Sequence, residues 1–216
     1  MNKSDRAFLR RALTGGPDDL RTIFRGRGCY VATNSYRAHI VWERPGPNIE
    51  LPRLFPYNAE NLQTIYQDLR VSSTYATISG FALYAVAKQA KSIGAADVYI
   101  ILRPDRLQVR ALSLISDFVT TVMEPRYTSR AIRTAVHRIR ADFVDGMEWK
   151  MRRRSKRVTY KYNGERAWAR LDPKYLEEAL RTLKSKDAVV HLHITDRAML
   201  LTAGHREALI MQRQIV

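Results

Sequence analysis

Two histidines at alternate positions of one segment come closer to a metal site than any other pattern in this sequence. His191 and His193 lie in a β-type run, where alternate side chains point to the same face of a sheet. Zinc binds imidazole nitrogens, but its sites use three or more protein ligands. A third ligand is not evident, although Asp187, Asp196 or His205 could come near in the fold. We therefore interpret both as surface histidines and keep a metal-dependent nucleic-acid-processing enzyme as an alternative.

The short motifs that commonly carry catalysis are absent from the sequence. It contains no GxxxxGK(S/T) loop, no GxGxxG after a strand, no GxSxG elbow and no HExxH. The single cysteine, Cys29, excludes an internal disulfide, and its strand-like neighbours favour a packed thiol over a nucleophile. We therefore expect that the protein is not an enzyme and needs no cofactor.

Basic side chains at helical spacing indicate a site that binds anions. Arg130, Arg133 and Arg140 share one face of a helix expected over residues 127–140, opposite an apolar stripe. A dense run of cations follows the helix, and its arginines are Arg152, Arg153 and Arg154. Such side chains bind phosphate oxygens without reading bases. A solvated helix face and a solvated hairpin are the alternatives.

The charge balance of the whole chain supports an anionic ligand. The sequence has 37 Lys and Arg residues against 21 Asp and Glu residues, which gives a formal net charge of +16. A charge of this size destabilises the compact state by self-repulsion and raises the affinity for polyanions. No stretch approaches the ~18 consecutive apolar residues of a spanning helix, and the N-terminus lacks a secretory apolar run. We expect a cytoplasmic protein that binds nucleic acid and no membrane.

The first half of the chain has the elements to position such side chains. An amphipathic helix is expected at 4–14, with Arg6 and Arg10 opposite its apolar side. A small antiparallel meander follows as far as residue 42. Prolines exclude a continuous helix or a central strand over residues 43–73, which form a connection with one or two helical turns at 61–68.

The order of elements then repeats. A helix at 78–92 carries Lys88 and Lys91 on its polar side, and three β-type runs follow it. The helix at 127–140 and further β-type runs repeat this order.

The last helix is the best-specified element of the sequence. Asp172 is its expected N-cap and Pro173 its first residue, and Lys174 and Arg181 are its basic residues. Three more β-type runs close the chain. The sequence therefore predicts an α+β protein with domains at 1–125 and 126–216, each with two helices packed on antiparallel sheets.

Three segments resemble one known family. YVATNSYRAHIV at 30–41 is similar to the bacterial sliding-clamp signature Val-Ala-Thr-Asp-Gly-His-Arg-Leu-Ala, which ends a β-meander. Residues 171–192 are similar to the final helix and strand of that family, and the ending LIMQRQIV resembles its closing Val-Met-Pro-Met-Arg-Leu. The chain thus resembles the second and third domains of the beta subunit of bacterial DNA polymerase III.

This resemblance implies two sets of binding residues. Helices that face a central channel would bind duplex DNA, and the expected DNA-binding residues are Arg6, Arg10, Lys88, Lys91, Arg130, Arg133, Arg140, Lys174, Arg181, Arg152, Arg153 and Arg154. A pocket for short peptides of polymerases and other clamp-binding proteins carries over to Thr33, Tyr36, Arg37, Ala38, Ile210 and Met211.

The expected function is that of a sliding clamp or processivity factor. Such a protein binds duplex DNA without sequence specificity and tethers a polymerase or another DNA enzyme. Homo-oligomers are expected, and a ring of six such domains would need three copies of this chain. The alternative is a monomeric accessory factor held on DNA by charge.

Overall fold

The structure, a computed structural model, describes residues 1–26, 28–43, 59–71, 75–102, 107–112, 117–122, 161–163, 167–183 and 189–213. The helix expected at 127–140, the β-type runs that follow it and the cation run lie mainly outside these ranges. The expected DNA-binding residues outside them are Arg130, Arg133, Arg140, Arg152, Arg153 and Arg154.

The described chain forms helices and antiparallel strands, with one 3-10 turn at Asp18–Leu20. The helices are α1 (Lys3–Ala12), α2 (Ala59–Val71), α3 (Gly80–Ser92) and α5 (Pro173–Leu180). The strands are β1 (Phe24–Gly26), β2 (Cys29–Thr33), β3 (Arg37–Trp42), β4 (Tyr75–Ser79), β5 (Asp97–Leu102), β6 (Leu107–Leu112), β7 (Asp117–Val122), β8 (Lys161–Asn163), β9 (Ala167–Leu171), β10 (Val189–Ile194), β11 (Ala198–Ala203) and β12 (Arg206–Met211).

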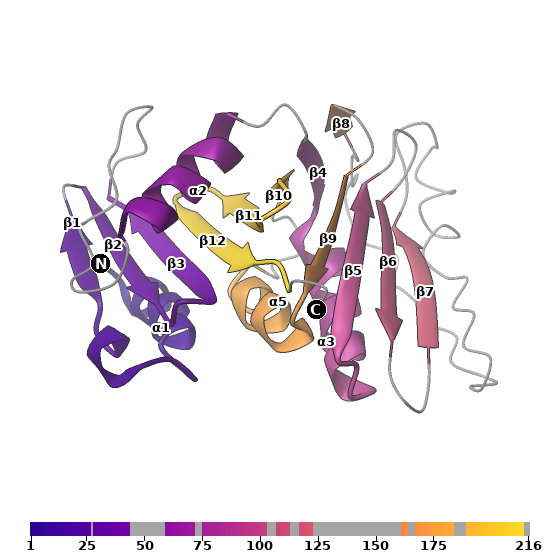
Figure 1. The fold of residues 1–216 in the computed structure, drawn as a ribbon, viewed down its shortest axis with the longest axis horizontal. Coiled ribbons are helices and arrows are strands. Elements are labelled where there is room, and N and C mark those ends of the chain that lie inside the picture. Colours follow the sequence, from indigo (N-terminus) through magenta and orange to yellow (C-terminus); the bar gives the residue numbers. More distant parts are fainter. Residues whose placement is uncertain are drawn as a thin grey trace.

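The strands form two antiparallel sheets. The larger sheet has eight strands in the order β1-β2-β3-β12-β11-β10-β4-β8, and the smaller has four in the order β7-β6-β5-β9. Helices α1, α5 and α3 lie together along one side of these strands (Figure 1). The prediction of an α+β protein with helices on antiparallel sheets is confirmed.

Two segments of the chain repeat one order of elements. A strand, a helix and three strands occur as β4-α3-β5-β6-β7 and again as β9-α5-β10-β11-β12. Each repeat gives its first strand to the sheet of the other, because β4 pairs with β10 and β9 pairs with β5. The N-terminal segment, α1-β1-β2-β3, is a helix and three strands, and it joins the second repeat where β3 pairs with β12.

The expected domain boundary between residues 125 and 126 falls among residues that the structure does not describe. Strand pairing joins residues on both sides of it, through β5 with β9 and β4 with β10. The division into 1–125 and 126–216 therefore stays a prediction.

Local capping explains where the helices begin. Asn2 and Asp5 form a capping box on α1, in which the Asp5 amide donates to Asn2 Oδ1 at 2.8 Å. Ser79 ends β4 and caps α3, so the helix expected from residue 78 begins two residues later, after a strand that the sequence did not reveal. Asp172 caps α5 as predicted, and Pro173 opens it.

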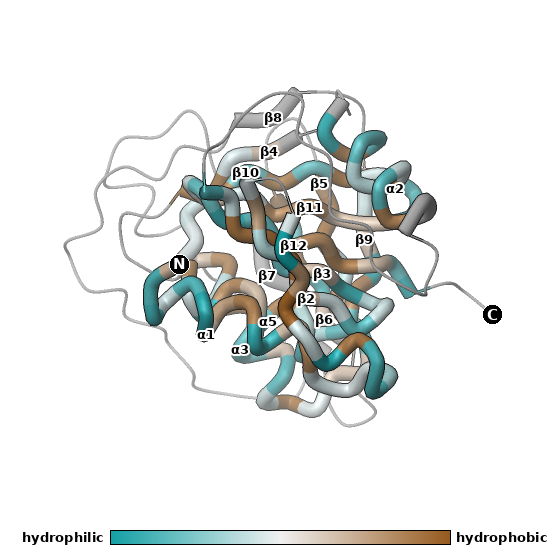
Figure 2. The backbone as a smooth tube through the Cα atoms, turned by 90° about the vertical axis from the view of Figure 1, so that its left-hand side faces the viewer, coloured by the Kyte–Doolittle hydropathy of each residue, from teal (hydrophilic) through white to brown (hydrophobic). Residues whose placement is uncertain are grey.

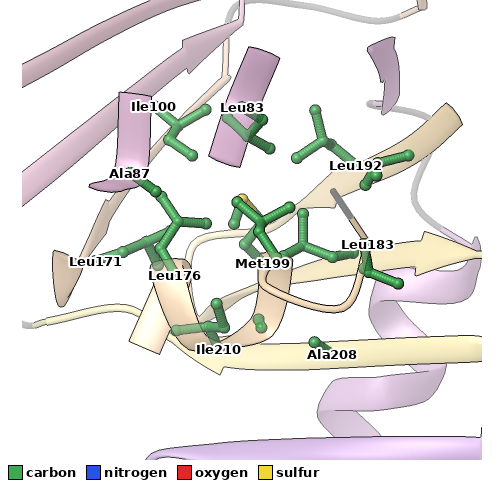
Figure 3. Close-up of a cluster of buried hydrophobic side chains, with 14 of the residues drawn as sticks. Leu83, Ala87, Ile100, Leu171, Leu176, Leu183, Leu192, Met199, Ala208 and Ile210 are labelled. Atoms are coloured by element: carbon green, nitrogen blue, oxygen red, sulfur yellow. The ribbon is translucent and has the colours of Figure 1, made fainter. Parts of the chain in front are cut away.

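The main hydrophobic core lies between helices α1, α3 and α5 and the two sheets. Its side chains come from α3, α5 and the inner strand faces, and they point toward one another (Figure 3). The labelled members are Leu83, Ala87, Ile100, Leu171, Leu176, Leu183, Leu192, Met199, Ala208 and Ile210. Because the same core contacts both repeats, it fixes α3 beside α5.

Truncating this core should destabilise the protein far more than truncating the helix surface. We expect Leu176→Ala, at a side chain with 0% exposure, to lower the free energy of unfolding by about 2–5 kcal/mol. Lys174→Ala on the same helix should change it by less than about 0.5 kcal/mol. Urea unfolding of both variants measures this, and equal effects would contradict the assignment of Leu176 to the core.

Candidate nucleic-acid interface

Helices α1, α5 and α3 form one layer, which we call the helix layer. It lies on the opposite side of the large sheet from α2, with β10, β11 and β12 between them (Figure 2). The helix layer buries its apolar residues against the strands, among them Phe8, Leu83 and Leu176. Its remaining side chains therefore determine the charge of this side of the molecule.

Basic residues outnumber acidic ones in the helix layer. The sequence of α1 contains four basic residues and one acid, that of α3 two basic residues and no acid, and α5 with its C-cap Arg181 two of each. The residues are Lys3, Arg6, Arg10, Arg11, Lys88, Lys91, Lys174 and Arg181 against Asp5, Glu177 and Glu178. On the other side of the sheet, α2 has two acids and one arginine.

Four of the expected DNA-binding residues are exposed and carry free charges. Arg6, Arg10, Lys88 and Lys174 are all solvent-exposed, and within the described part of the chain none of them forms an ion pair. Arg6 and Arg10 are four residues apart on α1, so they share one helix face. These cations are available to an anionic ligand.

Lys91 and Arg181, also expected to bind DNA, share one carboxylate. Lys91 Nζ lies 3.2 Å and Arg181 Nη2 2.8 Å from Glu177, whose side chain is almost fully buried between α3 and α5. Burial of this carboxyl opposes its ionisation, but the hydrogen bonds from Arg181 and Lys91 outweigh burial and lower its pKa. Two cations and one anion leave a single net positive charge here.

The other two acids of the helix layer are also paired. Asp5 accepts from Arg206 at 2.7 Å and lies 2.9 Å from His205 Nε2, at the turn before β12. Burial opposes the ionisation of Asp5, but its partners, foremost His205 and Arg206, lower its pKa. Glu178 accepts from the buried guanidinium of Arg37. Every carboxylate of the helix layer is thus already bound by a cation of the protein.

Arg11 and Glu177 belong to the site, although sequence reasoning did not select them. Burial lowers the pKa of Arg11, and Arg181 close by lowers it further, so cations are crowded where α1 meets α5. Because Arg11 directly follows Arg10, the two side chains point to different sides of α1. The sequence does not show that the side with Arg11 faces α5.

The turn between β2 and β3 leads into Arg37, which connects α1 to α5 because its guanidinium donates to Arg11 O on α1 and to Glu178 on α5. Asn34 Oδ1 accepts from the amides of Tyr36 and Arg37, each at 3.1 Å, and Asn34 Nδ2 donates to Thr14 O at 2.8 Å. Ser35 has φ of 75°, a conformation that favours glycine, and the clamp signature has glycine at this position. The resemblance in this segment therefore has a conformational basis.

The six residues expected to form a peptide pocket lie in different environments. Tyr36 is 58% exposed and its ring centroid lies 6.5 Å from that of Tyr175. Arg37 is buried, with its guanidinium 4.4 Å above the Tyr175 ring, and Ile210 belongs to the main core. Thr33 is buried and donates to Arg37 O at 2.7 Å.

Ala38 and Met211, the other two pocket residues, lie on the far side of the sheet. Both belong to a second apolar cluster, which includes residues of α2 and the outer faces of β2, β3, β11 and β12. The structure thus separates the pocket residues between two faces, and α2 packs over one of them.

The candidate metal-binding strand and the cysteine both belong to the large sheet. His191 Nδ1 lies 3.1 Å from Thr77 Oγ1 on β4, and the described residues contain no group of three or more His, Cys, Asp or Glu side chains that could hold a metal ion. Cys29 is buried, at 1% exposure, so the prediction of a packed thiol is confirmed. This burial raises the pKa of the thiol to about 11. Among the described helices, none is long and apolar enough to cross a membrane.

Comparison with solved structures identifies the fold. The DNA polymerase sliding clamp of Caulobacter crescentus matches with a TM-score of 0.59 and 11% identity, over 100% of this chain and 65% of that chain. DNA polymerase III subunit beta from Borrelia burgdorferi matches at 0.58 and 10% over 99% and 61%, and that from Pseudomonas aeruginosa at 0.57 and 11% over 97% and 64%. No family model and no curated protein matches the chain.

The chain therefore has the sliding-clamp fold, as its sequence predicted. At about 10% identity this likeness establishes the fold alone. The chain spans less than two thirds of the length of the clamp chains it matches.

The position of α1 depends on a buried histidine. His39 on β3 stacks on Phe8 with ring centroids 4.3 Å apart, and its Nδ1 lies 2.7 Å from Phe8 O. Burial lowers the pKa of His39 from 6.5 to about 3, so the ring is neutral and Nδ1–H donates to the carbonyl.

Acid should therefore weaken the fold through His39. Between pH 6.5 and about 3 the unfolded chain binds a proton that the folded protein excludes, so stability falls as pH falls, by up to about 1.4 kcal/mol per pH unit. The substitution His39→Gln removes the imidazole that binds this proton. Unfolding measured from pH 7 to 4 should be less pH-dependent in the variant, while the effects of Asp5 and Glu177 cancel in the comparison. Equal slopes would show that His39 is not excluded from protonation.

Proposed function

We propose that this protein is a sliding clamp or processivity factor that binds duplex DNA without sequence specificity through its helix layer. The observation that carries the proposal is the pairing of all three carboxylates of the helix layer with cations of the protein, while Arg6, Arg10, Lys88 and Lys174 remain exposed without an ion pair in the described chain. Phosphates are the ligand that such unneutralised cations bind.

The chemistry of these cations favours backbone contacts. Lys and Arg side chains on helix surfaces reach phosphate oxygens and displace condensed counterions, and this supplies affinity that does not depend on base sequence. Carboxylates whose charge is balanced by a paired cation add little repulsion toward phosphates, and α2, which carries two acids, lies on the other side of the sheet.

As a processivity factor the protein would be a non-enzymatic tether in the cytoplasm. Its partners would be duplex DNA and a DNA polymerase or another clamp-binding protein that carries a peptide motif. The contact residues for that motif would be Thr33, Tyr36, Arg37, Ala38, Ile210 and Met211, with the exposed Tyr36 as the accessible one. Outside the described residues, the proposed DNA-binding set also includes Arg130, Arg133, Arg140, Arg152, Arg153 and Arg154.

A second candidate is a monomeric accessory factor held on DNA by charge alone. The net charge of +16 favours it, because a protein with enough phosphate contacts needs no closed ring to stay bound. The two candidates share the helix layer and differ in assembly.

Removing cations from the helix layer should reduce the salt dependence of binding. We expect Arg10→Ala to lower the slope of log affinity against log salt by about 0.9, and a triple replacement of Arg6, Arg10 and Lys88 to lower it by about 2–3. Arg110→Ala is the matched control, because this exposed arginine lies on β6 between residues that face the core. Titration of unrelated duplexes measures both, and equal losses from Arg10→Ala and Arg110→Ala would refute the helix layer as the DNA site.

Assembly decides how long the protein stays on DNA. If three copies close a ring, the protein should remain on a nicked circle through a high-salt wash and leave when the circle is linearised. A monomer held by charge should leave both molecules alike as salt competes for phosphates. Molar mass in solution, measured with and without DNA, accompanies this test, and a monomeric mass with equal loss from both DNAs would exclude the ring.

A further inference from the structure

The outer side of the large sheet carries an apolar surface where the N-terminal segment meets the second repeat. We call it the outer surface. All its side chains are nearly fully buried, and they are Cys29, Val31, Ala38, Ile40, Trp42, Ala198, Leu200 and Leu209. In the described chain, α2 is the helix on this side (Figure 2). Ile65, Tyr66 and Leu69 of α2 are buried against it.

A buried carboxylate anchors α2 to this surface. Glu207 on β12 is 1% exposed and accepts hydrogen bonds from Trp42 Nε1 at 2.8 Å and from Arg70 Nη2 at 2.7 Å. Tyr66 Oη also donates to it, and Thr202 Oγ1 lies 3.4 Å away. Two donors thus come from the sheet and two from α2, and the cation comes from α2.

This anchor makes the outer surface selective for what covers it. Without α2, Glu207 would keep the donors of Trp42 and Thr202 but lose its cation. A replacement that buries this carboxylate again without a cation would be strongly destabilised. Any replacement must therefore supply apolar side chains and a basic or donor group. A purely apolar or acidic segment would leave Glu207 uncompensated.

Helix α2 depends on its contacts with the sheet for its stability. It has 13 residues, and isolated helices shorter than about 12–15 residues are marginal in water, so its helicity depends on docking. Its exposed residues include Thr64, Gln67 and Asp68, and it stands apart from the helix layer (Figure 2). Local opening of such a surface element costs less than global unfolding.

We infer that α2 is a displaceable cover of the outer surface, and that a partner protein docks there by replacing α2 with an amphipathic helix of the same chemistry. The partner helix would present apolar residues at the spacing of Leu62, Ile65, Tyr66 and Leu69, followed by a basic residue that reaches Glu207. Of the residues proposed to contact partner peptides, Ala38 belongs to this surface and Met211 packs against it. The inference rests on the proposed function in taking the partner to be a DNA enzyme and in its overlap with the proposed peptide-contact residues.

A peptide copy of α2 tests this directly. A fluorescent peptide of residues 59–71 is titrated against the wild-type protein and against a Tyr66→Phe/Arg70→Ala variant, which weakens the anchor and leaves every residue of the sheet in place. We expect at least tenfold tighter binding to the variant, because its own α2 competes less well. The same peptide with Arg70→Glu is the matched control and should bind at least tenfold more weakly. Equal, undetectable or Arg70-independent binding would overturn the proposal.

Hydrogen exchange of the wild-type protein tests the same proposal without any variant. Amides of α2 should exchange faster than those of β3 and β12, and the free peptide at high concentration should increase the difference. If α2 and the sheet exchange together, α2 is a fixed part of the core and the proposal fails. DNA titration of the double variant keeps the two proposals separate, since α2 lies away from the helix layer and affinity for duplex should change less than twofold.

Discussion

The antiparallel pairing of β3 with β12 is the contact on which the rest of the structure depends. It places Arg37 opposite Ile210 and Ile40 opposite Glu207, and so joins the N-terminal segment to the second repeat. Because side chains alternate across a strand, a slip of one residue would turn Arg37 toward α2 and Ala38 toward the helix layer. Both faces of the sheet are therefore set by this one register.

The two faces are chemically different. On one side, the carboxylates form ion pairs with cations of the protein. The exposed cations of α1 and α3 therefore stay available to a polyanion. On the other side, a single buried carboxylate binds an arginine from α2 over an apolar surface. The proposed DNA-binding site and the proposed partner site therefore share no residues, so occupation of one does not block the other.

Polar side chains near the C-terminus connect the two sheets. Gln212 and Arg213 stand where the clamp family has less polar residues. In the structure Gln212 Oε1 accepts from the Arg170 amide at 3.0 Å, and Arg213 donates to Asp172 at 2.6 Å and Ala96 O at 2.7 Å. These side chains tie the end of the large sheet to the edge of the small one, so their polarity has a structural cause.

The sequence by itself determined the local elements, the clamp fold and the sign of the charge. Periodicity and caps are local properties, so α1, α3 and α5 and most strands could be read directly, whereas β4 was hidden because Ser79 both ends a strand and caps a helix. Only the tertiary structure decided which cations remain free. Lys91 and Lys88 look alike on one helix face, but Glu177 comes from α5, and such a partner cannot be read from spacing along α3. The outer position of α2 was likewise beyond the sequence, because the carboxylate that holds it, Glu207, lies far along the chain.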